Sequence, residues 1–458
     1  MPERLSPSDM SSLLAERGPI HVHVGATTIM DGQPPDLEEL LAHVDARLAL
    51  VPRFRQRVTP DRLGLSNPEW TDDPGFDIRW HVRHSALPAP GSLGQLRDYV
   101  GRVMSGPLDL ERPLWQLYMI EGVEGGRFSV ISKTHHALVD GVSAVDVGTI
   151  LLDPNPEGTE MPLPEQAGEP DAPSPEMLFV RAASERIRQP LRSARKAATE
   201  AIRMPGETAS RVMRTAEGFV GLAAGGPTCP PSPLNVEIGR DRRVAYARGD
   251  LEAIKDARGE GGATVNDVIL AIAAGALRHF LAARGDAVPD HLVALVPVSV
   301  RRPDEHLDLG NRISTILVRL PLGIDDPRLR LERIRGETAR LKQSEQARAA
   351  SLIIEATGWT PPTINRLLSE LMARPRVFNL VISNVPGPQV PFYLLGRRML
   401  EVYPFVPLSP QGHALSIGVV SYDGGVFFGI VGDRRAVADI DDFEQALETA
   451  LTEQTESA

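Results

Sequence analysis

Apolar and polar residues follow two different periods along the first part of the chain, and each period predicts one kind of element. An alternation of period two over residues 20–30 predicts a strand, whereas apolar residues every three or four positions over 37–50 predict a helix. Two more strands are predicted at 115–123 and 127–134, because the residues between them, Glu-Gly-Gly, have the composition of a hairpin turn. A tight turn and a helix over 142–152 are expected to follow.

The second part of the chain repeats both periods. Thr264 precedes an apolar helical stretch over 268–281, and Asp267, three positions later, completes the pattern of a capping box. The other elements predicted in this way are strands at 292–300, 313–320, 377–383, 399–403, 414–422 and 426–431, and helices at 327–343, 363–373 and 441–451. Strands and helices mixed in both halves predict an α/β fold, an α+β sandwich with large sheets.

A segment rich in proline and acidic residues divides the chain. Residues 153–176 contain seven prolines and seven acids with no Lys or Arg, and such a composition does not form a packed helix or sheet. A basic stretch with helical character follows at 181–214, where nine Arg and Lys residues oppose three Glu. We therefore expect two lobes, 1–153 and 235–458, joined by a long crossover over 154–234.

Composition limits the classes of function. The 458 residues are 42% hydrophobic and 24% charged, which is typical of a globular protein large enough to enclose a cavity. The net charge of −11 argues against general nucleic-acid binding. The single cysteine, Cys229, cannot form an internal disulfide, so a reducing cytoplasm is expected. No signal-peptide core is present at the start, and the longest apolar runs fall short of the ~20 residues of a membrane span, so any membrane contact is expected to be peripheral.

The stretch that carries most chemical information is Ser-Lys-Thr-His-His-Ala-Leu-Val-Asp-Gly at 132–141. Neighbouring strand residues point to opposite faces, so His135 and His136 cannot readily bind one common metal ion, and we expect one ring to face a cleft while the other supports the wall behind it. An imidazole with a pKa near ~6.5 can accept a proton from a hydroxyl group. The alternative is a pair of structural histidines. Asp140 is placed to fix the local backbone or to pair with an arginine, and Gly141 suits the sharp turn.

Several motifs occur in one order along the chain. They are Leu-Ser-Pro-Ser-Asp at 5–9, Pro-Leu-Trp at 113–115, the histidine motif at 135–141, Asn-Asp at 266–267, Ser-Asn-Val-Pro-Gly-Pro at 383–388, Leu-Gly-Arg-Arg at 395–398 and Val-Tyr-Pro at 402–404. In this order and spacing the chain resembles the bacterial wax ester synthase/acyl-CoA:diacylglycerol acyltransferase family, over nearly its whole length apart from the acidic linker. The resemblance implies two lobes of the chloramphenicol-acetyltransferase type, with an active-site channel between them and the histidine motif at its centre.

The resemblance also implies roles for individual residues. It makes His136 the proton acceptor, with His135 and Asp140 shaping its surroundings and Gly141 among the residues that line the substrate. In the same family the motif formed by Asn266 and Asp267 is treated mainly as structural.

The sequence does not decide which residue donates a hydrogen bond to the oxyanion of the reaction, and each candidate has two interpretations. Ser383 and Asn384 end a predicted strand before a Pro-Gly turn, so they either line the channel as substrate-binding residues or are explained by the turn. The amide of Asn266 either contacts substrate or caps a helix.

The activity implied by the resemblance is the transfer of a long-chain fatty acyl group from acyl-CoA to diacylglycerol, with long-chain alcohols as further acceptors. Acyl-CoA is then a co-substrate, and no metal or prosthetic group is implied. The expected location is cytoplasmic, peripheral to the inner membrane or to lipid droplets, and the basic stretch at 181–214 is either a solvated face or a surface for anionic lipid. The alternatives are a condensation or acetyl-transfer enzyme of the same superfamily and a non-catalytic lipid-droplet-binding protein.

Overall fold

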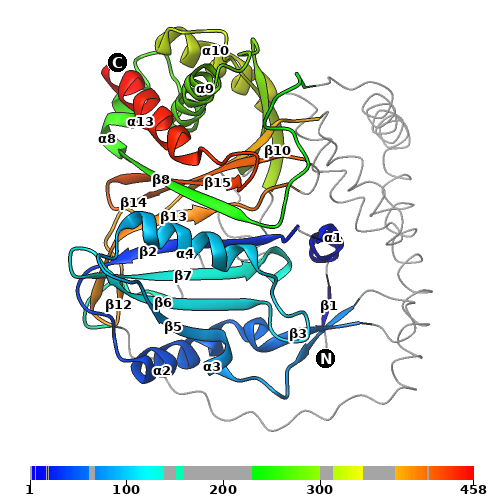
Figure 1. Cartoon of the computed structure of the whole chain (residues 1–458), viewed down its shortest axis with the longest axis vertical. Coiled ribbons are helices and arrows are strands. Elements are labelled where there is room, and N and C mark those ends of the chain that lie inside the picture. The colour runs from blue at the N-terminus through cyan, green and yellow to red at the C-terminus, as the bar shows by residue number, and fades with distance from the viewer. Residues whose placement is uncertain are drawn as a thin grey trace, which may run out of the picture.

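A computed structural model describes most of both expected lobes (Figure 1). The described residues are 3–5, 7–16, 18, 20–60, 68–138, 151–158, 229–299, 313–343, 377–409 and 412–457. Several sequence predictions lie outside them, namely Asp140, Gly141, most of the helix at 142–152, the basic stretch at 181–214 and the helix at 363–373.

The first sheet surrounds the strand that leads to the histidine motif. Within the described residues it contains six strands in the order β12-β13-β2-β7-β6-β5. Their bounds are Tyr393–Leu394 (β12), Arg397–Phe405 (β13), His23–Met30 (β2), Arg127–His135 (β7), Trp115–Val123 (β6) and Val82–Ala86 (β5). The helices of this lobe are Pro7–Ala15 (α1), Leu37–Arg47 (α2), Ile78–His81 (α3) and Leu93–Ser105 (α4), and a small sheet joins Glu3–Arg4 (β1), Glu69–Asp72 (β4) and Gln56–Thr59 (β3).

The second sheet also contains six described strands, in the order β10-β9-β11-β14-β15-β8. Their bounds are Ile313–Leu320 (β10), Leu292–Ser299 (β9), Leu380–Pro386 (β11), Leu415–Tyr422 (β14), Gly425–Asp433 (β15) and Arg242–Asp250 (β8). Its outer face is covered by the helices Leu251–Asp256 (α8), Val265–Ala283 (α9), Pro327–Gln343 (α10) and Ile440–Glu456 (α13) (Figure 1). The predicted hairpin turn is present, with Asp423 and Gly424 both at positive φ.

Helix α9 is strongly apolar, as its buried position requires. It is the one helix of the described residues that is long and apolar enough to cross a membrane, and 72% of its apolar window is buried inside the protein. Its side chains pack against α10 and α13. The apolar run recognised in the sequence therefore forms the centre of the second lobe.

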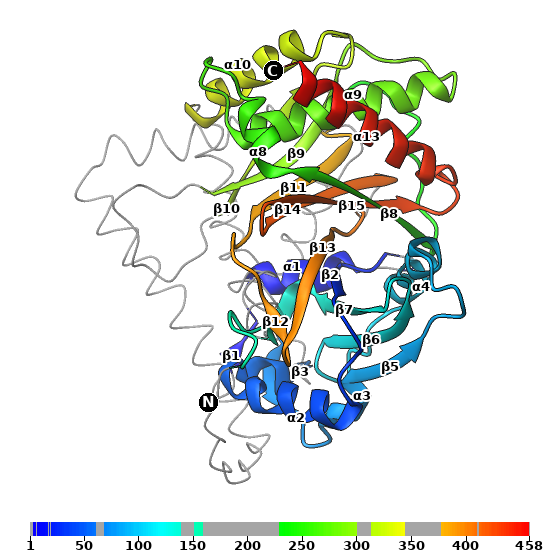
Figure 2. The same ribbon diagram turned by 90° about the vertical axis from the view of Figure 1, so that its left-hand side faces the viewer.

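Strands β12 and β13 cross from one lobe to the other. They follow β11 of the second sheet in sequence, yet β13 pairs antiparallel with β2 of the first sheet, with Phe405 opposite Gly25. Figure 2 shows β13, in orange, running beside β2. The segment 235–458 therefore contributes two strands, β12 and β13, to the first sheet. The division of the chain expected at residue 234 does not coincide with the division between the two sheets.

The two sheets meet where β13 passes β15. A side chain cannot be accommodated at Gly429 of β15, because a Cβ atom there would lie 1.8 Å from the carbonyl oxygen of Pro404. Beside this contact the ring of Tyr246, on β8, stacks on Tyr403 with ring centroids 4.2 Å apart, and its hydroxyl donates to Thr27 Oγ1 at 2.8 Å. This close approach fixes the position of β13 between the lobes.

The contact at Gly429 predicts a large loss of stability for Gly429→Ala. The added methyl group must push β13 away from β15, so the free energy of unfolding should fall by about 3 kcal/mol. Gly336→Ala is the matched control, because Gly336 is exposed in α10 and has no atom within 4 Å of the added Cβ. The control should be neutral or stabilising by up to about 1 kcal/mol. Urea unfolding of both variants measures this, and equal stability of Gly429→Ala and the wild type would contradict the described contact.

Candidate active site

The histidine motif lies at the end of a central strand of the first sheet. Strand β7 ends at His135, and the next three residues, His136–Leu138, form a 3-10 turn. The side chain of His135 is 0% exposed, whereas His136 is exposed. The two adjacent side chains therefore have different surroundings, with His135 at the end of the strand and His136 in the turn that follows.

Hydrogen bonds fix the backbone on both sides of His136. The His136 amide donates to the carbonyl oxygen of Val22 at 2.9 Å, and the His135 amide donates to that of Leu114 at 2.9 Å. The amide of Ala137 donates to Nδ1 of His135 at 3.1 Å. Because Nδ1 of His135 accepts this bond, the neutral ring carries its proton on Nε2.

A carboxylate faces that nitrogen. Oε2 of Glu16, the residue after α1, lies 3.3 Å from Nε2 of His135. Its other oxygen, Oε1, lies 3.0 Å from Nδ1 of His21 and 3.5 Å from Nε2 of His23. Burial raises the pKa of Glu16, but the contacts with the three histidines lower it more, so the pKa is held well below its usual range and the group is ionised.

The same cluster has the donor types of a cation site. Within the described residues, ligand atoms of Glu16, His21 and His23 lie within 4.8 Å of one another. Burial lowers the pKa of His23 to about 4, so this ring is neutral at neutral pH. The alternation over residues 20–30 predicted a strand but not this cluster. The pattern that could have indicated it is the placement of His21 and His23 two residues apart, and therefore on one face of the strand.

Two of the predicted site residues of the second lobe, Asn266 and Asn384, are in contact. Asn384, on β11, donates from Nδ2 to Oδ1 of Asn266, in the first turn of α9, at 3.2 Å. Asn266, Ser383 and Asn384 are all partly buried. Their roles in substrate binding stay predictions.

The capping role considered for Asn266 belongs to its neighbours. The amide of Asp267 donates to Thr264 Oγ1 at 3.2 Å, and the amide of Thr264 donates to Asp267 Oδ2 at 2.8 Å, which is the predicted capping box. The hydroxyl of Thr338 donates to Asp267 Oδ1 at 2.7 Å and ties α10 to α9. Asp267 therefore has a structural role.

Both halves of the chain match known domains. The wax ester synthase/diacylglycerol acyltransferase catalytic domain matches residues 5–269, and the C-terminal domain of the same family matches residues 309–454. The chain belongs to the wax ester synthase/diacylglycerol acyltransferase family. The family and the enzyme class predicted from the motifs are confirmed.

Similar proteins are found among sequences and solved structures. A probable diacylglycerol O-acyltransferase of Mycobacterium tuberculosis is 34% identical over 465 residues, which cover 98% of this chain and 97% of that protein. The wax ester synthase/diacylglycerol acyltransferase from Marinobacter aquaeolei VT8 is 29% identical, with a TM-score of 0.69 and 98% of both chains covered. The starter condensation domain of rhizomide synthetase has a TM-score of 0.59 at 12% identity, covering 100% of this chain and 94% of that one, which is a likeness of fold alone. The predicted two-lobe architecture of the family is confirmed.

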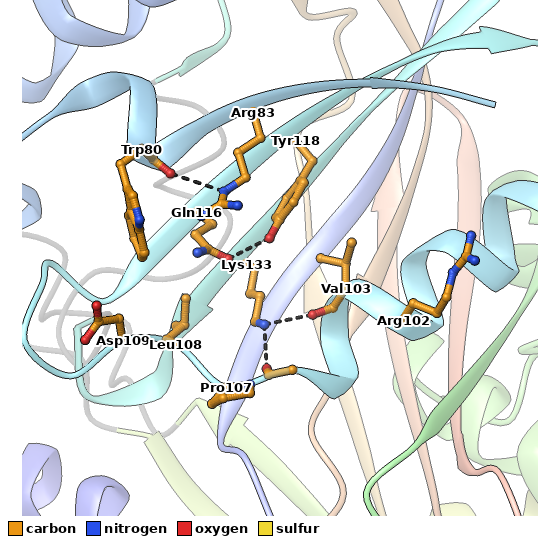
Figure 3. Close-up of a pocket in the computed structure, with 11 residues that line it drawn as sticks. Trp80, Arg83, Arg102, Val103, Pro107, Leu108, Asp109, Gln116, Tyr118 and Lys133 are labelled. Carbon is orange, nitrogen blue, oxygen red and sulfur yellow. Dashed lines mark hydrogen bonds between the residues drawn. The ribbon is translucent and has the colours of Figure 1, made fainter.

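A cavity of about 440 Å³ lies in the first lobe of this family member (Figure 3). It is lined by Trp80, Arg83, Arg102, Gln116, Tyr118 and Lys133, among others. Lys133 is two residues before His135 on the same face of β7. The cavity lies beside the motif strand within one lobe, and the channel expected between the lobes stays a prediction.

Lys133 is a buried cation that closes the end of α4. Its side chain is 1% exposed, and Nζ donates to the carbonyl oxygens of Val103 at 2.8 Å and Gly106 at 2.6 Å (Figure 3). The last carbonyl groups of a helix lack partners within the helix, so the ammonium satisfies them. Burial lowers the pKa of Lys133 to about 8.

This pKa predicts a pH-dependent stability that Lys133→Met removes. The unfolded chain has a lysine pKa near ~10.4, so between about pH 8 and pH 10.4 the unfolded state binds more protons than the folded state. The stability of the wild type should therefore rise with pH relative to Lys133→Met across this window, by up to about 1.4 kcal/mol per pH unit. Denaturant unfolding of both proteins from pH 7 to 11 measures the difference, because other titrating groups cancel. A difference that is constant with pH would be inconsistent with the lowered pKa.

Proposed function

We propose that the protein transfers a long-chain fatty acyl group from acyl-CoA to the free hydroxyl of diacylglycerol, with long-chain alcohols as a second class of acceptor. The products are triacylglycerol and wax ester. Membership of the family supports this reaction. The observation that carries it is the pair of adjacent histidines at the end of β7, where His135 is buried and anchored while His136 is exposed on a turn fixed by hydrogen bonds.

In the proposed reaction His136 acts as a general base. Its ring nitrogen accepts the hydroxyl proton of the acceptor while the oxygen attacks the carbonyl carbon of the thioester. The tetrahedral oxyanion that forms is held by fixed donors. The carbon–sulfur bond then breaks, the ester is released, and the imidazolium returns the proton to the sulfur of coenzyme A. A thiol with a pKa near ~8.5 leaves far more readily than an alkoxide, so no acyl-enzyme is required.

The remaining predicted residues have supporting roles in this proposal. Asp140 and Gly141 lie outside the described residues, and their proposed roles rest on the motif alone: Asp140 shapes the surroundings of His136, and Gly141 is a substrate-binding residue. Ser383 and Asn384 supply candidate donors to the oxyanion. The contact between Asn384 and Asn266 supports this role, because it fixes one amide relative to the other and leaves the capping of α9 to Thr264 and Asp267.

His136→Ala is expected to lower kcat by about 10²–10⁴-fold, which is the usual contribution of a general base, without unfolding the protein. His84→Ala is the matched control, because His84 is exposed on β5 of the same sheet and should leave kcat unchanged. The measurement is release of coenzyme A from palmitoyl-CoA with diacylglycerol, a long-chain alcohol and small polar acceptors in parallel.

The same assay tests the alternatives. A wild-type rate in His136→Ala would overturn the assigned role. Turnover confined to small polar acceptors would indicate a condensation or acetyl-transfer enzyme, and no turnover with any acceptor would indicate a lipid-droplet-binding protein.

We also propose that the protein acts in the cytoplasm at the surface of the inner membrane or of lipid droplets. Its acceptors reside in such surfaces. The sequence at 181–214 supports the proposal, because its excess of basic residues is accompanied by apolar ones, a combination that suits anionic lipid.

Charge reversal tests this surface. Replacing Arg188, Arg192, Arg195 and Lys196 together by Glu should abolish co-sedimentation with liposomes that contain anionic lipid, because each basic residue near such a surface contributes about 1 kcal/mol. The matched control replaces four exposed arginines of the folded lobes, Arg83, Arg102, Arg258 and Arg333, by Glu. Unchanged sedimentation of the first variant would show that the stretch is a solvated face.

A further inference from the structure

We propose that Glu16 is a positioning residue for His136, which holds the turn of the base in place through His135 and the His21–His23 segment. The proposal rests on the function proposed above for His136. It concerns a residue of the N-terminal segment, about 120 positions from the histidine motif in sequence.

The first part of the argument is the chain of contacts through His135. Nδ1 of His135 accepts the amide of Ala137, so the opposite nitrogen bears the proton and faces Oε2 of Glu16 at 3.3 Å. An anion at this position favours the tautomer and the ring orientation that the Ala137 amide requires. Glu16 thus fixes the peptide unit that follows His136.

The second part is the contact through β2. Oε1 of Glu16 lies 3.0 Å from Nδ1 of His21 and 3.5 Å from Nε2 of His23, whose rings stack with centroids 5.2 Å apart. Between these two residues lies Val22, and its carbonyl oxygen accepts the amide of His136. The same carboxylate therefore also fixes the peptide unit that precedes the base.

The third part is the placement of Glu16 itself. It follows α1 directly, its amide bonds to the carbonyl oxygen of Leu13, and α1 packs on the turn that contains His136. The side chain of Glu16 is 15% exposed, while the rings of His23 and His135 are buried. A carboxylate in this setting is screened little by water, so it attracts the neighbouring ring N–H groups more strongly than it would at the surface. Of its three contacts, the one with His21 Nδ1 is a hydrogen bond.

The consequence for catalysis is geometric. A base must lie within hydrogen-bond reach of the hydroxyl it deprotonates, and a displacement of about 1 Å can lower a rate by about 10²-fold. Loss of the Glu16 charge should therefore lower kcat and leave the KM for acyl-CoA nearly unchanged. A purely structural role would instead lower the melting temperature and leave kcat of the folded enzyme unchanged.

The experiment compares Glu16→Gln, Glu16→Asp and a control in the full-length enzyme. Glu16→Gln keeps the shape but removes the charge, so kcat should fall by about 10–100-fold, with KM for palmitoyl-CoA within about twofold of the wild type. Glu16→Asp keeps the charge and should recover part of the lost kcat. Glu453→Gln is the matched control, since Glu453 makes a similar contact, 2.9 Å from Nε2 of His279, on the outer side of the second lobe. It should leave kcat unchanged.

Each outcome decides the proposal. Wild-type kcat in Glu16→Gln would overturn it, as would a change confined to KM. If Glu16→Gln does not fold, Glu16→Asp decides, because its shorter side chain moves the carboxylate away from the rings: kcat below the wild type at unchanged KM supports the proposal, and kcat equal to the wild type overturns it. A stoichiometric divalent metal in the purified enzyme, removed by chelation together with activity, would make Glu16 a ligand and overturn the positioning role. Full activity of His136→Ala would contradict the proposed function itself. Full activity of Glu16→Gln together with an inactive His136→Ala would contradict only the positioning role of Glu16.

Discussion

The close packing of β13 on β15 is the contact on which the arrangement of the two lobes depends. Strand β13 is hydrogen-bonded to β2 in the first sheet, and its Pro404 carbonyl oxygen occupies the space where any side chain at residue 429 would lie. A backbone contact of this kind leaves no room for sliding. Because β2 is held between β13 and β7, the packing at the centre of the molecule also fixes the strand that faces the histidine motif, with His23 opposite His135.

That register determines what the end of β7 can do. The ladder between β2 and β7 runs as far as His135, and the chain then turns away, so the next backbone amides lose their partners in the ladder. Buried amides need acceptors, and here Val22 and the ring of His135 provide them. The exposed ring of His136 is therefore attached to a backbone with little freedom. Ordering of this kind supplies what a proposed general base needs, which is a defined position.

Much of the fold follows from periodicity, but the sheet to which a strand belongs does not. The sequence predicted the strands that became β2, β6, β7, β9, β10, β11, β13, β14 and β15. Alternating apolar residues show that a strand has one buried face, but they do not show which strands it pairs with. The pairing of β13 with β2 of the first sheet was therefore not predictable. Helix α4 was missed although its sequence carries the signals of a helix: Leu96, Val100 and Met104 recur at helical spacing behind a capping box formed by Ser92 and Gln95. What the sequence could not show is why Gly101 is required, which is the close approach of the Arg242 backbone from the other lobe.

The candidate site also combines residues that the sequence indicates with residues that only the fold reveals. The histidine motif was visible as a run of polar residues at the end of an apolar strand, and the contact between Asn266 and Asn384 joins two motifs that the sequence had selected separately. Glu16 was not selected, because a single glutamate after a short helix has no distinguishing pattern. Its contacts with the three histidines arise only when the fold brings α1, the start of β2 and the end of β7 together.

The histidines of the site differ in burial, and this difference determines which of them can exchange a proton with a substrate. The ring of His23 is enclosed, and burial lowers its pKa to about 4, so it cannot hold a proton at neutral pH. His135 is equally buried: its Nδ1 accepts the amide of Ala137, and its Nε2 lies 3.3 Å from Oε2 of Glu16. His21 contacts the carboxylate through Nδ1. Of the four, His136 alone is exposed, so its ring can be reached by a substrate hydroxyl. In the proposed reaction the thiol is already a good leaving group, so the base needs accessibility and a fixed position more than an unusual pKa, and the buried histidines and Glu16 supply that position.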